Sequence, residues 1–170
     1  MIDNKKKIAF LDRDGVINKN AAEHQYITNL RYFKFNNDIF DLLKYVADRD
    51  FEIIVITNQR GIAKKIFSEI ELSKIHNHMV AEFNRNDIKI LDVFYCPHEK
   101  GICNCRKPKP GLIYQAMEKY PIDINNSILI TDSENEIEMG KNIGLKCSYL
   151  APMDNPGKLL NNLKTNQTKL

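Results

Sequence analysis

Short, nearly continuous apolar runs recur along this chain, and they constrain its fold more than any other feature of the sequence. The runs are KIAFLD, FEIIVITN, ILDVFYC, SILITD and KCSYL, at residues 7–12, 51–58, 90–96, 127–132 and 146–150. Most are rich in isoleucine, valine or phenylalanine, and they lack the polar alternation of a strand with one face in water. Such runs are typical of parallel strands that are buried on both faces.

Amphipathic helical patterns separate these runs. The segment 36–50 carries an apolar stripe at helical spacing, and the segment 68–87 opens with the capping-box pair Ser68 and Glu71. Further helices are expected over 110–120 and 134–144. Strands that alternate with helices predict an α/β fold with a doubly wound, Rossmann-like parallel sheet.

The length of 170 residues fits one domain with a substantial core. We assign residues 1–154 to this domain. Residues 155–170 are rich in asparagine and lysine, so we expect a C-terminal tail that is a weak helix or frayed.

Polar side chains follow the predicted strands, where parallel sheets of this kind bind their ligands. The strand ends carry Asp12, Thr57, Cys96 and Asp132. Asp12 and Asp14 form a D-x-D-G sequence, and two such carboxylates raise each other's proton affinity unless a cation lies between them. One of them can then act as nucleophile and the other as proton donor, with Mg²⁺ screening both. The alternative is an ordinary turn, which this sequence also favours.

The other strand ends and the CRKPKPG stretch, residues 105–111, favour the catalytic interpretation. Thr57 offers a hydroxyl, Lys107 an ammonium group and Asp132 a further carboxylate, with Glu136 one helical turn later. Phosphoryl transfer through an aspartyl-phosphate needs this set, because carboxylates hold Mg²⁺ while hydroxyl, amides and lysine neutralise the phosphate oxygens. We therefore predict Asp12, Asp14, Thr57 and Lys107 as catalytic residues, and Asp12, Asp14 and Asp132 as Mg²⁺ ligands.

Three of the four cysteines lie close together in CPHEKGICNCRKPKPG, residues 96–111. Cys96, His98, Cys103 and Cys105 supply enough ligands for a closed tetrahedral Zn²⁺ site, in which the metal is structural. Disulfides and a metal-free cysteine cluster are the alternatives, and a reducing compartment disfavours the first. The Zn²⁺ would fix the direction of Arg106 and Lys107, which follow the last ligand.

The segments FLDRDGVIN, VITNQRGI, CPHEKGICNCRKPKPG and LITDSENE together resemble, in this order, the motifs of the haloacid dehalogenase superfamily of phosphatases. The resemblance covers residues 7–150. Within the superfamily, the chain most resembles the histidinol-phosphate and heptose bisphosphate phosphatase group, which lacks a large cap domain. It implies Asp12 as the nucleophile, Asp14 as the acid and base, and Mg²⁺ held by Asp12, Asp132 and the Asp14 carbonyl. The implied substrate is a heptose 1,7-bisphosphate cleaved at C7.

Substrate contacts are expected at His24, Asn58, Gln59, Arg60 and Arg106. Three positions depart from the group's pattern, because Ser133 replaces a lysine, Glu136 replaces an aspartate and Arg60 replaces a small residue. Histidinol phosphate or another small sugar phosphate is the rival substrate. An inactive, zinc-stapled binding module is the rival from another class, although the intact Asp12 and Asp14 pair argues against it.

Charge and hydropathy exclude several partners. The net charge of +3 is far below that of a dedicated nucleic-acid binder, and the sequence has no apolar run of membrane length. We expect a cytoplasmic monomer that acts on a small phosphorylated sugar and binds neither nucleic acid nor membrane.

Overall fold

The structure is a computed structural model, and it describes residues 5–23, 25–145, 147–151 and 155–165. Its centre is a five-stranded, fully parallel sheet with the strand order β3-β2-β1-β4-β5. The strands are β1 (Lys7–Asp12), β2 (Phe51–Asn58), β3 (Ile90–Cys96), β4 (Ile128–Thr131) and β5 (Cys147–Leu150). They coincide with the five apolar runs to within one or two residues, so the predicted parallel sheet is confirmed.

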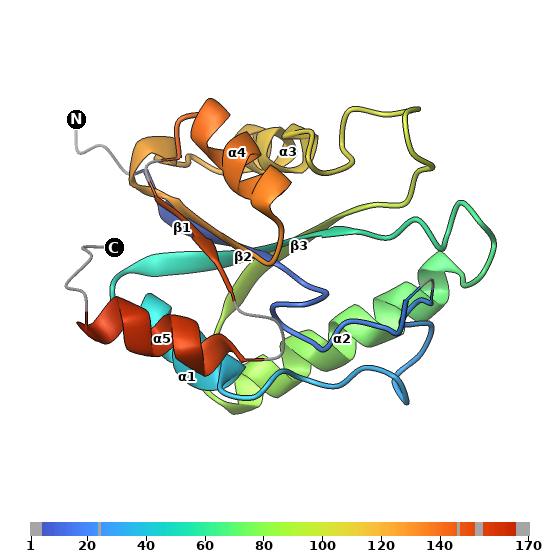
Figure 1. Cartoon of the computed structure of the whole chain (residues 1–170), viewed down its shortest axis with the longest axis horizontal. Coiled ribbons are helices and arrows are strands. Elements are labelled where there is room, and N and C mark those ends of the chain that lie inside the picture. Colours follow the sequence, from blue (N-terminus) through green and yellow to red (C-terminus); the bar gives the residue numbers. More distant parts are fainter. Residues whose placement is uncertain (1–4, 24, 146, 152–154, 166–170) are drawn as a thin grey trace.

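Helices cover both faces of the sheet (Figure 1), as the continuous apolar strands require. They are α1 (Ile39–Ala47), α2 (Glu69–Arg85), α3 (Gly111–Lys119), α4 (Glu134–Asn142) and α5 (Pro156–Thr165), with a short 3₁₀ helix at Ile124–Asn126. Figure 1 shows α1, α2 and α5 on one face and α3 and α4 on the other. The strands divide their side chains accordingly: Ala9 and Leu11 pack in the first core, Ile8 and Phe10 in the second.

Local signals in the sequence set the helix ends. The Ser68 side chain accepts a hydrogen bond from the Glu71 amide and the Glu71 side chain bonds back to Ser68, so the predicted capping box opens α2. Gly144 adopts a positive φ of 90° just after α4, a conformation that costs glycine little. No helix within the described residues is long and apolar enough to cross a membrane.

Residues 156–165 are better packed than the composition of this part of the chain indicates. Helix α5 buries Leu159, Leu160 and Leu163, and these side chains join the core that contains α1 and α2. Their spacing along the sequence is helical, and this periodicity outweighs the polar composition between them. Within the segment 155–170, predicted to be a weak helix or a frayed tail, the described residues 156–165 form a helix that packs on the core.

The order of the strands creates the site. From β1 the chain builds outward through β2 and β3, and it then crosses back to place β4 and β5 on the other side of β1. The connections therefore diverge between β1 and β4, which leaves a crevice beyond their carboxyl ends. Asp12 ends β1 and Asp132 follows β4, so both carboxylates lie at this crevice.

Candidate active site

Asp12 lies at the centre of the site and is almost fully buried, with 8% of its surface exposed. Its Oδ1 lies 2.7 Å from the Nζ of Lys107 and 2.7 Å from the backbone amide of Arg13, which donates to it. Burial raises the pKa of Asp12 to about 7 against the pull of Lys107, and the charges of Glu136 and Asp132 raise it further. Excess negative charge thus surrounds the predicted nucleophile, as a cation site requires.

Lys107 is fixed from two sides. Its Nζ lies 2.7 Å from Asp12 and 3.0 Å from Glu136 Oε2, which also accepts a hydrogen bond of 2.8 Å from Thr131. Burial disfavours the ammonium ion, but the charges of Asp12 and Glu136 outweigh it and raise the pKa of Lys107. The sequence left the role of Glu136 open, and the structure makes it the second anionic partner of this lysine.

Asp14 lies in a cage of donors. Arg13 donates to both of its carboxylate oxygens, at 2.9 Å each from one guanidinium nitrogen. Asn18 donates to Oδ1 at 2.9 Å and Gln59 to Oδ2 at 3.0 Å. Burial favours the neutral acid, yet the charge of Arg13 and these hydrogen bonds prevail and lower the pKa of Asp14. The resting carboxylate is therefore ionised and held in one position.

The turn after β2 contributes Thr57 and two amide side chains. Thr57 is buried, and its hydroxyl oxygen accepts a hydrogen bond of 2.8 Å from Gln59, which leaves its own proton free for an anion. Asn58 exchanges two hydrogen bonds with the backbone of Lys107, at 3.0 and 3.1 Å. The side chains of Asn58 and Gln59, predicted to contact substrate, are thus engaged in holding Lys107 and Asp14.

Asp132 approaches the turn after β1 from the other side of the crevice. A Cβ atom at Gly15 would lie 1.9 Å from its Oδ2, so only glycine permits this approach, and Gly15 also has a φ of 87°. Asn20 donates to the same oxygen at 3.0 Å. The carboxylates of Asp12 and Asp132 therefore converge on the backbone of this turn.

The predicted metal ligands on the 96–105 loop also converge. The ligand atoms of Cys96, His98, Cys103 and Cys105 all lie within 4.8 Å of one another. The sulfur of Cys105 is 3.0 Å from that of Cys96 and 3.2 Å from Nδ1 of His98. Burial and the neighbouring thiols raise the pKa of Cys105 to about 12. Such a crowded set of thiols and imidazole matches the donors that Zn²⁺ prefers.

Two predicted substrate contacts lie beside this loop. Arg60 forms an ion pair with Glu99, which joins the turn after β2 to the cysteine loop. Arg106 is half-buried, and one of its terminal nitrogens is buried without a hydrogen-bond partner. A buried donor of this kind is uncommon in a folded protein and suits a site that receives an anion. The remaining predicted contact, His24, lies outside the described residues.

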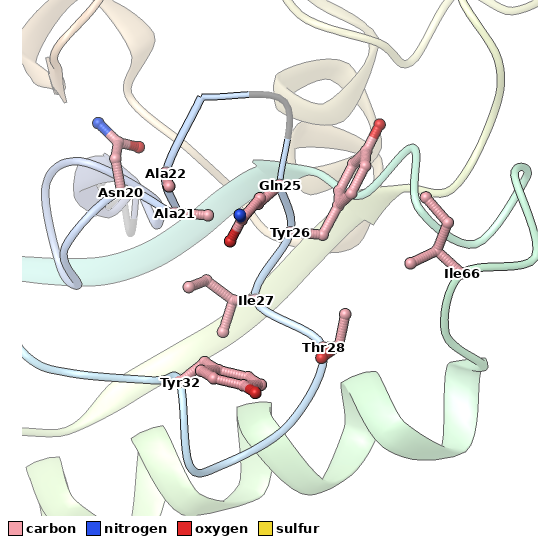
Figure 2. A pocket seen from close by; sticks show the side chains of 9 residues that line it. All are labelled: Asn20, Ala21, Ala22, Gln25, Tyr26, Ile27, Thr28, Tyr32 and Ile66. Atoms are coloured by element: carbon pink, nitrogen blue, oxygen red, sulfur yellow. The ribbon is translucent and has the colours of Figure 1, made fainter.

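Two adjoining pockets lie beside the segment that follows β1. The smaller, of about 300 Å³, includes Arg13, Asp14 and Gln59 in its wall. The larger, of about 490 Å³, is lined by the segment after β1 and by Ile66 from the segment before α2. Figure 2 shows its aromatic and polar side chains, among them Tyr26, Thr28 and Tyr32. Both pockets share residues between Asn20 and Ile27, so a ligand can extend from one into the other.

Sequence reasoning missed several residues of this site. Arg13, Asn18 and Asn20 hold the carboxylates, and His76 of α2 contacts Arg13. One feature of the sequence could have pointed to Arg13, because this cationic residue lies between the two aspartates of D-x-D. Nothing in the sequence indicated that this cation is buried.

Comparison with known proteins identifies the family. The model of the polynucleotide kinase 3 phosphatase family matches residues 7–154, which is most of the chain. This chain belongs to that family. Its relatives include the D-glycero-alpha-D-manno-heptose-1,7-bisphosphate 7-phosphatase of Photorhabdus laumondii, 41% identical over 92% of this chain and 88% of the relative. The enzyme of the same name from Campylobacter jejuni is 39% identical over 81% of this chain and 78% of the relative.

Solved phosphatase structures share the fold. The D,D-heptose 1,7-bisphosphate phosphatase of B. bronchiseptica, complexed with magnesium and phosphate, superposes with a TM-score of 0.78. It is 25% identical to this chain, and the match covers 92% of this chain and 86% of the other. The predicted resemblance to the haloacid dehalogenase phosphatases is therefore confirmed, together with the fold that it implied.

Proposed function

We propose that this protein is a Mg²⁺-dependent phosphatase that removes the 7-phosphate of D-glycero-D-manno-heptose 1,7-bisphosphate through an aspartyl-phosphate. The observation that carries the proposal is the contact of 2.7 Å between Asp12 and Lys107 at the crevice between β1 and β4. It places a carboxylate nucleophile beside a fixed cation that can neutralise a phosphate oxygen. The heptose bisphosphate phosphatases among the relatives support the choice of substrate.

The reaction takes two steps at one phosphorus atom. An Asp12 oxygen attacks phosphorus and the bond to the sugar oxygen breaks, while Asp14 gives its proton to that oxygen. Water then attacks the phosphorus of the aspartyl-phosphate, Asp14 takes a proton from that water, and Asp12 leaves as a carboxylate. Lys107 and the Thr57 hydroxyl stabilise the transferring group in both steps. Bond cleavage and proton transfer therefore balance without a further reactant.

Asp14 must carry a proton in the first step, although Arg13 lowers its pKa in the resting protein. A phosphate dianion that enters the crevice brings negative charge close to Asp14, which raises the proton affinity of the carboxyl group. In the second step the position beside Arg13 and Gln59 suits a base that accepts a proton from water. The cage thus supports both tasks.

The donors around the crevice fit Mg²⁺. The Asp12 and Asp132 side chains, with the Asp14 carbonyl, offer the oxygen ligands that this ion takes, and the absence of a side chain at Gly15 lets Asp132 approach the turn after β1. When bound, the ion supplies positive charge to the phosphate oxygens. The likeness to a structure complexed with magnesium and phosphate supports this choice.

The cysteine cluster fits a structural Zn²⁺, because four protein ligands converge and leave no position for substrate. Cys105 is followed directly by Arg106 and Lys107, so the metal would hold the cation that contacts Asp12. Thiol ligands need a reducing compartment, and we therefore place the enzyme in the cytoplasm. A monomeric state remains a prediction.

The larger pocket suits the sugar, because hydroxyl and amide groups of Tyr26, Thr28 and Gln25 can bond to a polyhydroxylated chain. Arg106 is our candidate for the second phosphate, since its planar group can bind two phosphate oxygens. Its unpartnered buried nitrogen supports this role.

Arg106→Ala should lower kcat/KM for the heptose bisphosphate by about 30- to 1,000-fold, the scale of a lost charge-assisted contact. The loss should be much smaller for a simple phosphomonoester and absent for histidinol phosphate, whose cation the arginine repels. Phosphate release from the three substrates measures this. Equal losses on all three would show that Arg106 serves the reacting phosphate or the fold.

The affinity for Mg²⁺ should depend on pH because the ion must displace a proton from Asp12. The Asp12 pKa of about 7 in the metal-free protein means that the carboxyl is protonated below this pH and ionised above it. The dissociation constant should therefore rise about tenfold for each pH unit below the pKa and level off above it. Calorimetric titration at several pH values measures it, and a constant affinity across this range would contradict the assignment.

A substrate panel tests the proposed function. It contains both anomers of the heptose 1,7-bisphosphate, histidinol phosphate, small sugar phosphates and an oligonucleotide 3′-phosphate, which the name of the family brings in. We expect the highest kcat/KM on a heptose bisphosphate, with the α anomer preferred because relatives named for it are 39 to 41% identical. Preference for another substrate overturns the assignment, and no phosphate release at all would favour a binding module.

A further inference from the structure

Arg13 is the largest fully buried side chain in the described part of the protein, with 1% of its surface exposed. A guanidinium group cannot lose its charge in a protein, so burial requires partners around its whole edge. Asp14 occupies one side, where it accepts hydrogen bonds from Nε at 3.2 Å and from the second terminal nitrogen at 2.9 Å. The first terminal nitrogen points away from Asp14 and needs another acceptor.

His76 fills that position. Its Nε2 lies 3.1 Å from the first terminal nitrogen of Arg13, and its ring, on the buried side of α2, is only 8% exposed. Because arginine can only donate, Nε2 must be the acceptor, and the imidazole is neutral with its proton on Nδ1. Burial, and secondly the charge of Arg13, lower the pKa of His76 to about 3, which agrees with a neutral ring. The ring also meets Tyr95 edge to face.

We propose that His76 is a positioning residue for Asp14 and acts through Arg13. The inference rests on the proposed function, in which Asp14 transfers protons to and from the reacting oxygens. The planar guanidinium is held at one edge by His76 and presents its other edge to the Asp14 carboxylate, so the histidine fixes the plane in which Asp14 lies. General acid catalysis depends on such positioning, because small displacements of the acid cost rate.

Substitution of a residue that serves only folding would lower the activity on all substrates alike. A residue that positions the general acid affects mainly substrates whose leaving oxygen needs a proton. A sugar alkoxide is a poor leaving group and needs it, whereas 4-nitrophenolate leaves as an anion. The comparison uses kcat/KM, because this constant covers the steps up to the first bond cleavage and excludes hydrolysis of the phosphoenzyme.

Four variants separate the two roles. His76→Leu removes the acceptor and keeps an apolar side chain, while His76→Gln supplies a carbonyl oxygen that Arg13 can donate to. His78→Leu is the matched control, because His78 lies on the same helix and packs against Phe33 and Phe35. Asp14→Asn gives the full effect of losing the acid.

For His76→Leu we expect kcat/KM to fall about tenfold on the sugar phosphate and by less than about threefold on 4-nitrophenyl phosphate, a partial form of the Asp14→Asn effect. His76→Gln and His78→Leu should stay within about threefold of wild type on both substrates. Equal losses on both substrates, or no rescue by glutamine, would overturn the inference while leaving the proposed function intact. A wild-type protein inactive on every substrate would instead overturn the proposed function.

A measurement without substrate completes the test. The Nε–H signal of Arg13 in a ¹⁵N spectrum, assigned with Arg13→Lys, should exchange slowly with water in the wild type and in His76→Gln. In His76→Leu the exchange should be at least about tenfold faster, because an unanchored guanidinium opens more often. Unchanged exchange in His76→Leu would show that the histidine does not hold Arg13.

Discussion

Asp12→Asn should lower phosphate release by more than about 10³-fold, because the amide cannot attack phosphorus and no longer offers an anionic ligand to Mg²⁺. The loss should appear in kcat on every substrate, since the bond to Asp12 forms in every turnover. The variant should fold normally. The substitution removes a carboxylate whose ionised form is disfavoured by burial, and Lys107 keeps its contact with Glu136.

Steady-state phosphate release measures this effect, with Asp41→Asn as the control for an aspartate on the surface of α1. The control should keep the rate of the wild type. A turnover close to normal in Asp12→Asn would rule out Asp12 as the nucleophile and with it the proposed mechanism.

Cys105→Ser should release Zn²⁺ and destabilise the protein, because a closed metal site contributes directly to folding. We expect a loss of about 3 kcal/mol or more, which corresponds to roughly 10 °C in Tm for a chain of this size. Activity should fall as well, since Arg106 and Lys107 follow the lost ligand in the chain. Elemental analysis and thermal unfolding measure the first two effects.

Cys147→Ser is the control, because Cys147 belongs to strand β5, far along the sequence from residues 96–105, and the variant should retain its metal. Wild-type protein prepared under reducing conditions should carry about one Zn²⁺ per chain, as four ligands imply. Freshly prepared wild type without zinc, or Cys105→Ser with unchanged Tm, would contradict the structural role of the cluster.

The strands could be predicted from the sequence because β1, β2 and β4 are buried, continuous apolar runs, and β1, β2 and β3 were bounded correctly to the residue. Helix α5 was underestimated for the opposite reason. Its three leucines are separated by asparagine and lysine, and only their helical spacing indicates that they share one buried face. Composition is a weaker guide than periodicity where a helix has a narrow apolar stripe.

The site could be predicted where residues follow strands, because the edge of a parallel sheet brings such residues together. Asp12, Thr57 and Asp132 were proposed in this way, whereas Lys107 was proposed from the CRKPKPG stretch, which follows β3 only after the cysteine-rich loop. The hydrogen bonds within the site could not be predicted, since Arg13 meets His76 across 63 positions and Gln59 meets Asp14 across 45. Arg60 was expected beside the phosphate, and its pairing with Glu99 depends on how the cysteine loop folds.

Chemical trapping of the phosphoenzyme tests the central claim most directly. The protein is mixed with Mg²⁺ and heptose 1,7-bisphosphate, quenched in acid during turnover and reduced with borohydride, which converts an aspartyl-phosphate into homoserine. Peptide mass spectrometry then locates the modified residue. We predict homoserine at position 12 in the wild type, none in Asp12→Asn, and heptose 1-phosphate as the product. Turnover without modification at Asp12, or modification at another residue, would contradict the mechanism proposed for this site.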